Sequence, residues 1–274
     1  MSSTQASSTQ VINKDGLLTY TDDTYLTAPD AASHFLRLFP TLNFYRKFSW
    51  NVFRSSLVAR RGKYDEAEWS RTSHEVFKSL EAVGVRTEIN GVEQIRNLDS
   101  PCVFVANHMS MMETMVLPAI IQPICDVTFV VKQSLMDYPL FRHIVRARDP
   151  IAVTRTNSRQ DFKTVMQDGS ERLKKGISIV VFPQTTRSLK FDSSNFNTIG
   201  VKLALRTKVP VIPIALKTDA WGNGKWLKDL GRIHPDKAVH FAFGEPITIE
   251  GRGSQQQQDV IRFIQSKLNE WDED

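Results

Sequence analysis

Residues 103–114 read Val-Phe-Val-Ala-Asn-His-Met-Ser-Met-Met-Glu-Thr, a stretch that joins an apolar run to a histidine and an acid. Its four apolar residues lead into Asn107 and His108, a pattern that predicts a buried strand ending at the histidine. Glu113 follows five positions after the histidine, one turn into a predicted helix. A histidine at the carboxyl end of a strand lies where α/β sheets bind ligands, and it accepts protons near neutral pH.

The spacing of His108 and Glu113 leaves two interpretations open. Side chains five positions apart on a regular helix point about 140° away from each other, so the two meet only if His108 lies in the turn before the helix. In that arrangement Glu113 would orient the imidazole, as the acid of a catalytic triad does. Alternatively, His108 only caps the helix and Glu113 is solvated. Ser110 is a weaker candidate for a nucleophile, because no Gly-x-Ser-x-Gly motif surrounds it.

Composition limits the classes of protein to consider. The 274 residues, 41% of them hydrophobic, suffice for one large domain or a domain with an appendage. A net charge of +5 favours anionic partners, namely membrane lipid, a phosphorylated substrate or nucleic acid. Cys102 and Cys125 are predicted to be buried, reduced thiols, and no cysteine–histidine cluster has metal-ligand spacing. We identify no secretory signal and no apolar run of ~18 residues that would span a membrane.

The first 83 residues are predicted to contain a tail and a helical segment. Residues 1–29 are polar and predict a flexible tail or an arm on the body, and residues 30–83 predict a helical segment that contacts a membrane. Between Asp30 and Asp65 aromatic and leucine residues alternate with arginine and lysine, and no acid occurs, a composition typical of interfacial helices. Pro40 predicts a break into two helices.

This segment also has two other interpretations. It could form a helical pair docked on the main domain with its basic side in water. Nucleic-acid binding is disfavoured, because no recognition helix or RNA-binding motif is present. We therefore expect a membrane phospholipid surface as a partner, and no nucleic acid.

Residues 84–274 are predicted to form an α/β domain. An Asn90-Gly91 turn predicts a hairpin within residues 85–95. Further strands are predicted at 102–106, 127–131, 151–154, 177–182, 211–216 and 238–243, and helices at 64–83, 110–121, 134–146, 159–175, 199–207 and 255–271. This alternation predicts a mostly parallel central sheet flanked by helices, preceded by the N-terminal amphipathic helical segment.

Cationic residues follow three consecutive predicted strands. The apolar strand at 177–182 runs into Pro-Gln-Thr-Thr-Arg-Ser at 183–188, and the two preceding strands also end in a cation. Parallel strands share their carboxyl ends, so one edge of the sheet should carry the histidine of the first motif together with Lys132, Arg155 and Arg187. Such an edge suits an anionic, phosphorylated ligand. Taken alone, residues 183–188 could equally be a polar turn that satisfies backbone groups.

The order and spacing of these motifs resemble those of the glycerolipid acyltransferases related to 1-acylglycerol-3-phosphate acyltransferase. The motifs of that family are Asn-His followed after four residues by Asp, a strand ending in Arg, Phe-Pro-Glu-Gly-Thr-Arg-Ser, and Val-Pro-Val-Ile-Pro. The matching residues are Asn107-His108 with Glu113, Arg155, residues 182–188 and residues 209–213, together with Lys132, Leu135 and Pro139 of a Lys-x-x-Leu-x-x-x-Pro pattern. The resemblance covers about residues 85–250, and the ordered set is far more specific than any single motif.

The resemblance implies an O-acyltransferase of phospholipid synthesis or remodelling. It would move an acyl group from acyl-CoA or acyl carrier protein, as co-substrate and without a further cofactor or metal, to the hydroxyl of a lysophospholipid. His108 would be the base and Glu113 its orienting acid. Lys132, Arg155 and Arg187 would hold the acceptor's phosphate, and Gln184, Thr185 and Thr186 would contribute to the acceptor pocket. The protein would be peripheral or monotopic, on the cytoplasmic side of a membrane.

Three departures from the family pattern keep alternatives open. Glu113 stands where the family has Asp, Gln184 where it has Glu, and Thr185 where it has Gly. The acceptor could therefore carry a different polar group. The chain could also be a lipid-binding member with altered catalysis, or a hydrolase that uses the same histidine.

Overall fold

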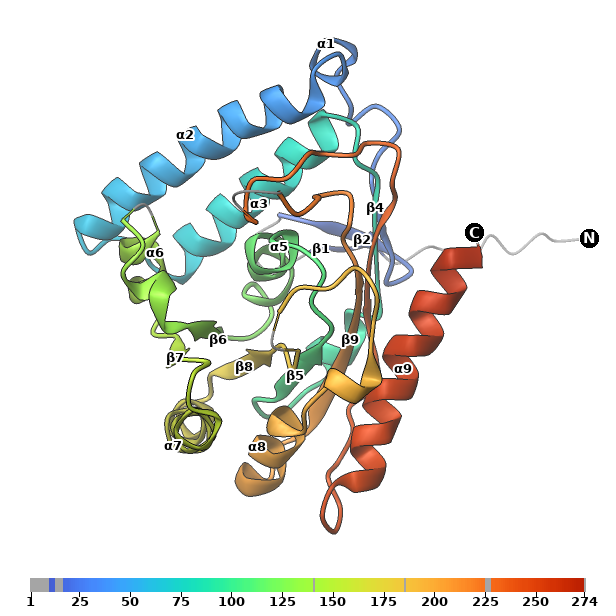
Figure 1. The fold of residues 1–274 in the computed structure, drawn as a ribbon. Coiled ribbons are helices and arrows are strands. Elements are labelled where there is room, and N and C mark those ends of the chain that lie inside the picture. The colour runs from blue at the N-terminus through green and yellow to red at the C-terminus, as the bar shows by residue number, and fades with distance from the viewer. Residues whose placement is uncertain (1–9, 13–16, 140, 185, 225–227, 274) are drawn as a thin grey trace, which may run out of the picture.

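The computed structural model describes residues 10–12, 17–139, 141–184, 186–224 and 228–273. An eight-stranded sheet forms its centre (Figure 1), with the strand order β3-β4-β10-β9-β5-β8-β6-β7. In that order the strands are Tyr25–Leu26, Thr87–Asn90, Val239–Phe243, Val211–Lys217, Val103–Ala106, Ser178–Val181, Val127–Lys132 and Ile151–Val153. All neighbours from β9 to β7 are parallel, and β4 is parallel to β10, whereas β3–β4 and β10–β9 are antiparallel. The predicted mostly parallel sheet is confirmed.

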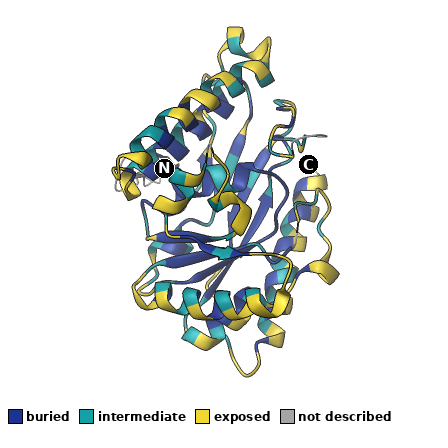
Figure 2. Cartoon of the chain, turned by 60° about the vertical axis from the view of Figure 1, so that its left-hand side comes forward, coloured by how far each residue is buried: buried dark blue, intermediate teal, exposed yellow. Residues whose placement is uncertain are grey.

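Helices cover both faces of the sheet. On one side lie α1 (His34–Arg37), α2 (Pro40–Arg60), α3 (Glu66–Ala82), α5 (Met112–Ile121) and α6 (Arg142–Ala147), and on the other α7 (Ser158–Lys174), α8 (Ile199–Thr207) and α9 (Ser254–Glu273). The short elements are α4 (Glu93–Arg96), η1 (Gln133–Met136) and η2 (Ser193–Asn195). Figure 2 shows the sheet buried between these two layers.

Strand β5 contributes to the hydrophobic core on both faces of the sheet. Phe104 and Ala106 belong to the core beneath α2, α3 and α5, while Val103 and Val105 belong to the core beneath α7, α8 and α9. A strand buried on both faces needs a continuous apolar run, which is why residues 103–106 carry no polar residue. This burial fixes the position at which β5 delivers the residues that follow it.

Part of residues 1–29 forms an ordered arm on the body, which is the second of the two predicted arrangements. Strands β1 (Gln10–Ile12) and β2 (Thr19–Thr21) pair with each other, and β3 joins the edge of the main sheet. Leu18 and Tyr20 are buried against the body, which explains why this polar segment does not remain flexible. The rest of the predicted tail, residues 1–9 and 13–16, lies outside the described residues.

Two predictions of secondary structure are wrong. The hairpin at residues 85–95 does not form, because the chain enters α4 after β4. Gly91 makes that turn at φ +77°, and a Cβ on it would lie 2.1 Å from the Phe243 carbonyl oxygen. The helix predicted at 134–146 is replaced by η1 and α6, with Pro139, which disfavours a continuous helix, between them.

The predicted break between two helices at Pro40 is confirmed. Pro40 is the first residue of α2, where a proline's missing N–H costs no hydrogen bond, and α1 ends just before it. Cys102 and Cys125 are free thiols, as predicted, but only Cys102 is fully buried, whereas Cys125 is partly exposed. Partial burial raises the pKa of Cys125 to about 11. Within the described residues no helix is both long and apolar enough to cross a bilayer.

Candidate active site

Asn107 anchors the end of β5 and so places the histidine that follows it. Its side-chain amide donates to the Leu216 carbonyl at 2.8 Å and accepts from the Leu216 N–H at 2.9 Å. These two bonds continue the pairing of β5 with β9 for one more residue through a side chain. His108 therefore leaves the sheet at a fixed point at the carboxyl end of β5.

His108 and Glu113 form the pair that the sequence predicts. Helix α5 begins only at Met112, so His108 lies in the preceding turn and its Nδ1 is 3.2 Å from Glu113 Oε2. The Glu113 carboxylate is fully buried, so the solvated alternative is wrong. Its Oε1 accepts from the N–H groups of Met109 at 2.8 Å and Ser110 at 2.9 Å, which compensate its loss of water. The carboxylate thus caps the start of α5 and contacts the imidazole at the same time.

The segment after β8 contacts both the ring and the backbone of His108. The imidazole stacks on the Phe182 ring, with centroids 4.3 Å apart. The His108 N–H donates to Gln184 Oε1 at 2.6 Å, and the Ser188 N–H donates to the His108 carbonyl at 2.9 Å. Gln184 is buried in this contact and is not among the residues that line the cavity described below. The amide supports the histidine backbone instead.

A cavity of about 490 Å³ joins the histidine to the predicted cations. Its polar wall contains His108 and the predicted residues Lys132, Arg155, Thr186 and Arg187. The predicted convergence on one edge of the sheet is therefore confirmed in space. Thr185 lies outside the described residues. The remaining wall is largely apolar, and includes Trp69, Met115, Phe129, Phe141, Ile144 and Phe182.

Two guanidinium groups face the cavity close to each other. Burial and the nearby positive charge of Arg187 both lower the pKa of Arg155 from its usual value. The backbone at Arg155 has φ +62°, a conformation that side chains rarely adopt, and the Asp161 carboxylate supports it by accepting from the Arg155 N–H at 2.7 Å. Like charges held together at a partly buried wall favour a ligand with negative charge.

Residues after β9 complete the site, and sequence reasoning missed them. Arg187 donates to the Asp229 carboxylate and, at 3.3 Å, to the Lys228 carbonyl, and both of these residues line the cavity. Asn223 donates to the Met109 carbonyl at 2.9 Å, next to the histidine. Thr218, which donates to Glu113, directly follows β9. The place of Thr218 at the carboxyl end of an apolar strand could have identified it as a site residue from the sequence. The irregular segment that holds Asp229 has no such pattern.

Ser110 does not face the cavity. Its hydroxyl is fully buried, donates to Thr218 Oγ1 at 3.1 Å and accepts from the Met112 N–H at 3.0 Å. These bonds give it a capping role at α5 rather than that of a nucleophile. No group of three or more His, Cys, Asp or Glu side chains within the described ranges is arranged to hold a metal ion.

Comparisons with known proteins identify the class. Residues 86–217 match the model of the Acyltransferase family. The 1-acyl-sn-glycerol-3-phosphate acyltransferase of Pseudomonas aeruginosa is 28% identical over 210 residues, which cover 75% of this chain and 77% of that protein. The chloroplastic 1-acyl-sn-glycerol-3-phosphate acyltransferase BAT2 of Brassica napus is 29% identical over 140 residues, 51% of this chain and 38% of the relative.

A solved structure shares the fold. The crystal structure of the 1-acyl-sn-glycerophosphate acyltransferase PlsC from Thermotoga maritima superposes with a TM-score of 0.63 and 23% identity, over 86% of this chain and 96% of that one. Taken with the sequence relatives, the fold and the site define an O-acyltransferase. The match to the Acyltransferase model over residues 86–217, just under half of the chain, agrees with the resemblance that its motifs show.

Proposed function

We propose that this enzyme acylates the free hydroxyl of a lysophospholipid resembling 1-acylglycerol-3-phosphate, as a step of phospholipid synthesis. The proposal rests on one arrangement: His108, which Glu113 contacts from beneath the surface, lines the same cavity as Arg155 and Arg187, and the rest of that cavity's wall is largely apolar. A base, an anion site and an apolar channel are the three features that an acyl transfer to a phosphorylated lipid needs. The names of the relatives support the same acceptor class.

The chemistry follows from the orientation of the imidazole. Glu113 holds the Nδ1–H form of His108, which leaves the Nε2 lone pair to accept a proton. Nε2 takes the proton of the acceptor hydroxyl while that oxygen attacks the thioester carbonyl of the donor. The new C–O bond forms, the C–S bond breaks, and the imidazolium returns the proton to the leaving thiolate. This direct transfer forms no acyl-enzyme, and in it no residue acts through a metal.

The cationic wall positions the acceptor. In the proposed complex Lys132, Arg155 and Arg187 bind the phosphate, since guanidinium groups offer paired donors to its oxygens. Thr186 lies on the same wall and offers a hydroxyl. Fixing the phosphate there brings the acceptor hydroxyl to the histidine and gains the advantage of proximity. The acyl donor is acyl-CoA or acyl carrier protein, with no additional cofactor.

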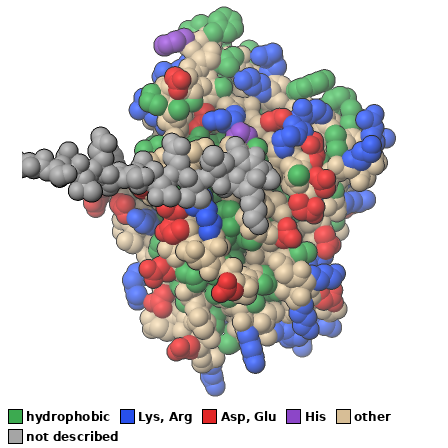
Figure 3. Space-filling view, turned by 180° about the vertical axis from the view of Figure 1, so that it is seen from behind, with side chains coloured by type: hydrophobic (Ala, Val, Ile, Leu, Met, Phe, Trp, Pro, Cys, Tyr) green, Lys and Arg blue, Asp and Glu red, His purple; other side chains and the backbone are tan. Residues whose placement is uncertain are grey.

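Helices α1 and α2 provide the membrane contact in this proposal. The inner face of α2 packs on the core through Phe44 and Phe48, yet its outer face and α1 are also apolar. The exposed side chains there include Phe35 at 76%, Leu38, Phe39, Leu42 at 69%, Trp50 at 65% and Phe53. Figure 3 shows hydrophobic and basic side chains interspersed along this edge of the molecule. A helix that is apolar on two sides needs a second apolar surface, and a bilayer supplies one.

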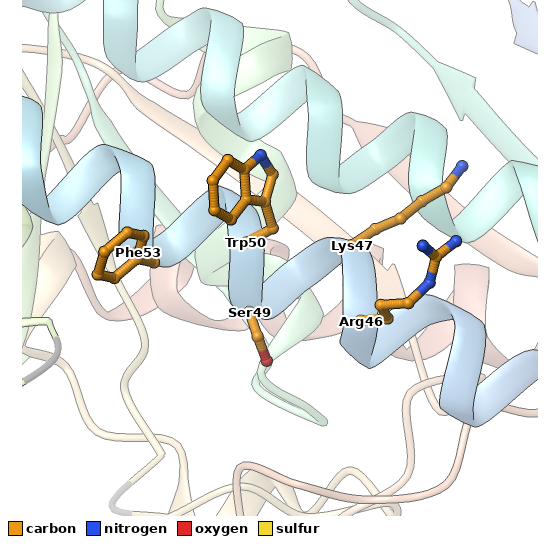
Figure 4. A pocket seen from close by; sticks show the side chains of 5 residues that line it. All are labelled: Arg46, Lys47, Ser49, Trp50 and Phe53. Atoms are coloured by element: carbon orange, nitrogen blue, oxygen red, sulfur yellow. The ribbon is translucent and has the colours of Figure 1, made fainter.

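Cations on the same outer face support an anionic lipid surface. Figure 4 shows Arg46 and Lys47 beside Trp50 and Phe53, with which they line a shallow hollow on α2. Within the described part of the chain, Arg54 pairs with Glu75, whereas Arg46 and Lys47 form no ion pair. We therefore propose a peripheral or monotopic protein that lies on the cytoplasmic, anionic leaflet with its cavity beside the lipid.

Product analysis tests this function. Purified enzyme is incubated with a panel of lysolipids that differ in head group, with acyl-CoA or acyl carrier protein donors, and products are identified by mass spectrometry. We expect a diacylated product from 1-acylglycerol-3-phosphate. Free fatty acid released without an acceptor would instead show a hydrolase. Lipid binding without any product would show a lipid-binding protein that lacks catalysis.

A further inference from the structure

Thr218 lies at the centre of the buried polar network around Glu113. It is fully buried, directly after β9, and its Oγ1 donates to Glu113 Oε1. The same Oγ1 accepts from Ser110 Oγ at 3.1 Å. Because the Ser110 proton occupies this contact, the Thr218 proton is directed to the carboxylate.

The two carboxylate oxygens of Glu113 have different partners. Oε1 accepts from Thr218 and from the N–H groups of Met109 and Ser110. Oε2 is the oxygen that meets His108 Nδ1, at 3.2 Å, with the Ser110 N–H at 3.1 Å as its other contact. The bonds to Oε1 anchor the carboxylate, and this anchoring aims Oε2 at the imidazole.

A glutamate requires this anchoring more than an aspartate would. Its side chain has one more rotatable bond, and a terminal carboxylate torsion is broad rather than confined to narrow wells. The N–H groups at the start of α5 restrain the carboxylate from one side only. Thr218, which comes from a different strand, restrains it from a second direction.

We propose that Thr218 is a positioning residue for acyl transfer, which acts through Glu113 to hold the His108 imidazole in the orientation that leaves Nε2 facing the acceptor. This inference rests on the proposed function, because it requires that His108 is the base. Loss of the Thr218 hydroxyl should therefore lower kcat and leave acceptor affinity unchanged, since Thr218 does not line the cavity. A residue that only filled the core would change stability and leave turnover of the folded protein unaltered.

Kinetics of full-length variants test this role. Thr218→Val removes the donor with nearly the same shape, and we expect kcat to fall about tenfold or more with KM unchanged. Thr218→Ser keeps the hydroxyl and is expected to retain nearly wild-type kcat. If the valine variant does not fold, Thr218→Ser and Thr218→Ala make the same comparison, because both lack the methyl group. Thr72→Val, which also removes a buried hydroxyl, is the matched control for a general effect on the core.

A double-mutant cycle separates positioning from packing. In a Glu113→Gln background, Thr218→Val should lower kcat by less than about twofold, because the carboxylate that Thr218 positions is already absent. Equal losses in both backgrounds would overturn the inference, and so would equal losses in the serine and valine variants. Wild-type enzyme that transfers no acyl group would contradict the proposed function itself, whereas active wild type with fully active Thr218→Val would contradict only the role of Thr218.

Discussion

The Arg187 guanidinium donates to the Asp229 carboxylate within the wall of the cavity that His108 lines. An internal carboxylate therefore neutralises one of the cations to which we assign the acceptor's phosphate. A phosphate that binds Arg187 must displace this carboxylate or share the guanidinium with it. We expect the ion pair to lower the affinity of the site for anions and to ease release of a phosphorylated product.

Replacing Asp229 should strengthen acceptor binding. In Asp229→Asn the guanidinium is no longer neutralised, so we expect KM for the lysophospholipid to fall about tenfold, with little change in kcat. The measurement is initial velocity against acceptor concentration. Asp137→Asn, which removes the partner of Arg146 outside the cavity wall, is the matched control. A higher KM in Asp229→Asn would mean that the carboxylate helps to bind the acceptor.

Glu113 should not tolerate a change in charge or length. Glu113→Gln is expected to lower kcat about a hundredfold, because a neutral amide cannot stabilise the positive charge of the imidazolium. This loss should be smaller than the loss caused by removing the histidine. Glu113→Asp restores the residue of the family motif, yet a shorter side chain cannot reach both Thr218 and the imidazole from its place in α5. We therefore expect reduced activity. Higher activity in Glu113→Asp would show that the site still fits aspartate.

Trp69 should limit the length of the bound acyl chain. The cavity follows β6 from Lys132 at its polar end to Thr128, about 13 Å along the strand. At that far end Trp69 packs on Phe129, and the Arg148 guanidinium lies 4.9 Å from the Trp69 ring centre. Trp69→Leu should shift the preference towards longer chains, as measured by competition between donors of different length. An unchanged preference would place the acyl chain elsewhere.

The outer face of α1 and α2 should control membrane binding. Leu42→Ser, Trp50→Ser and Phe53→Ser combined should abolish co-sedimentation with vesicles that contain phosphatidylglycerol, because exposed apolar area is lost. Thermal unfolding should change little, since these side chains are exposed in the protein. Leu189→Ser, an exposed leucine at 56% outside these helices, is the control. Undiminished binding of the triple variant would contradict the assignment.

Sequence reasoning predicts the residues that obey simple rules of position. His108, Lys132, Arg155 and Arg187 each lie at or just beyond the end of an apolar strand, and parallel pairing brings such ends together. The contact of Glu113 with the histidine also follows, once the helix is known to start after His108. The core strands are predicted within one or two residues for the same reason, because burial on both faces demands continuous apolar runs.

Contacts set by tertiary packing could not be predicted in this way. Gln184 follows a strand like the cations, yet its side chain turns inward to the His108 N–H. Asp229 lies in an irregular segment, and Trp69 reaches the cavity from α3, in a part of the chain outside the motifs. Residues 17–26 pack on the body because Leu18 and Tyr20 are buried. The polar average composition of residues 1–29 gave no indication of these two contacts.

Turnover of His108→Ala shows whether this imidazole is the base of the acyl transfer. Release of CoA thiol from acyl-CoA in the presence of 1-acylglycerol-3-phosphate is measured for wild type and variant, with thermal unfolding as a check on folding. We expect a loss of about a thousandfold in kcat, because the base of the reaction is removed. A folded His108→Ala variant that turns over at the wild-type rate would contradict this role of His108.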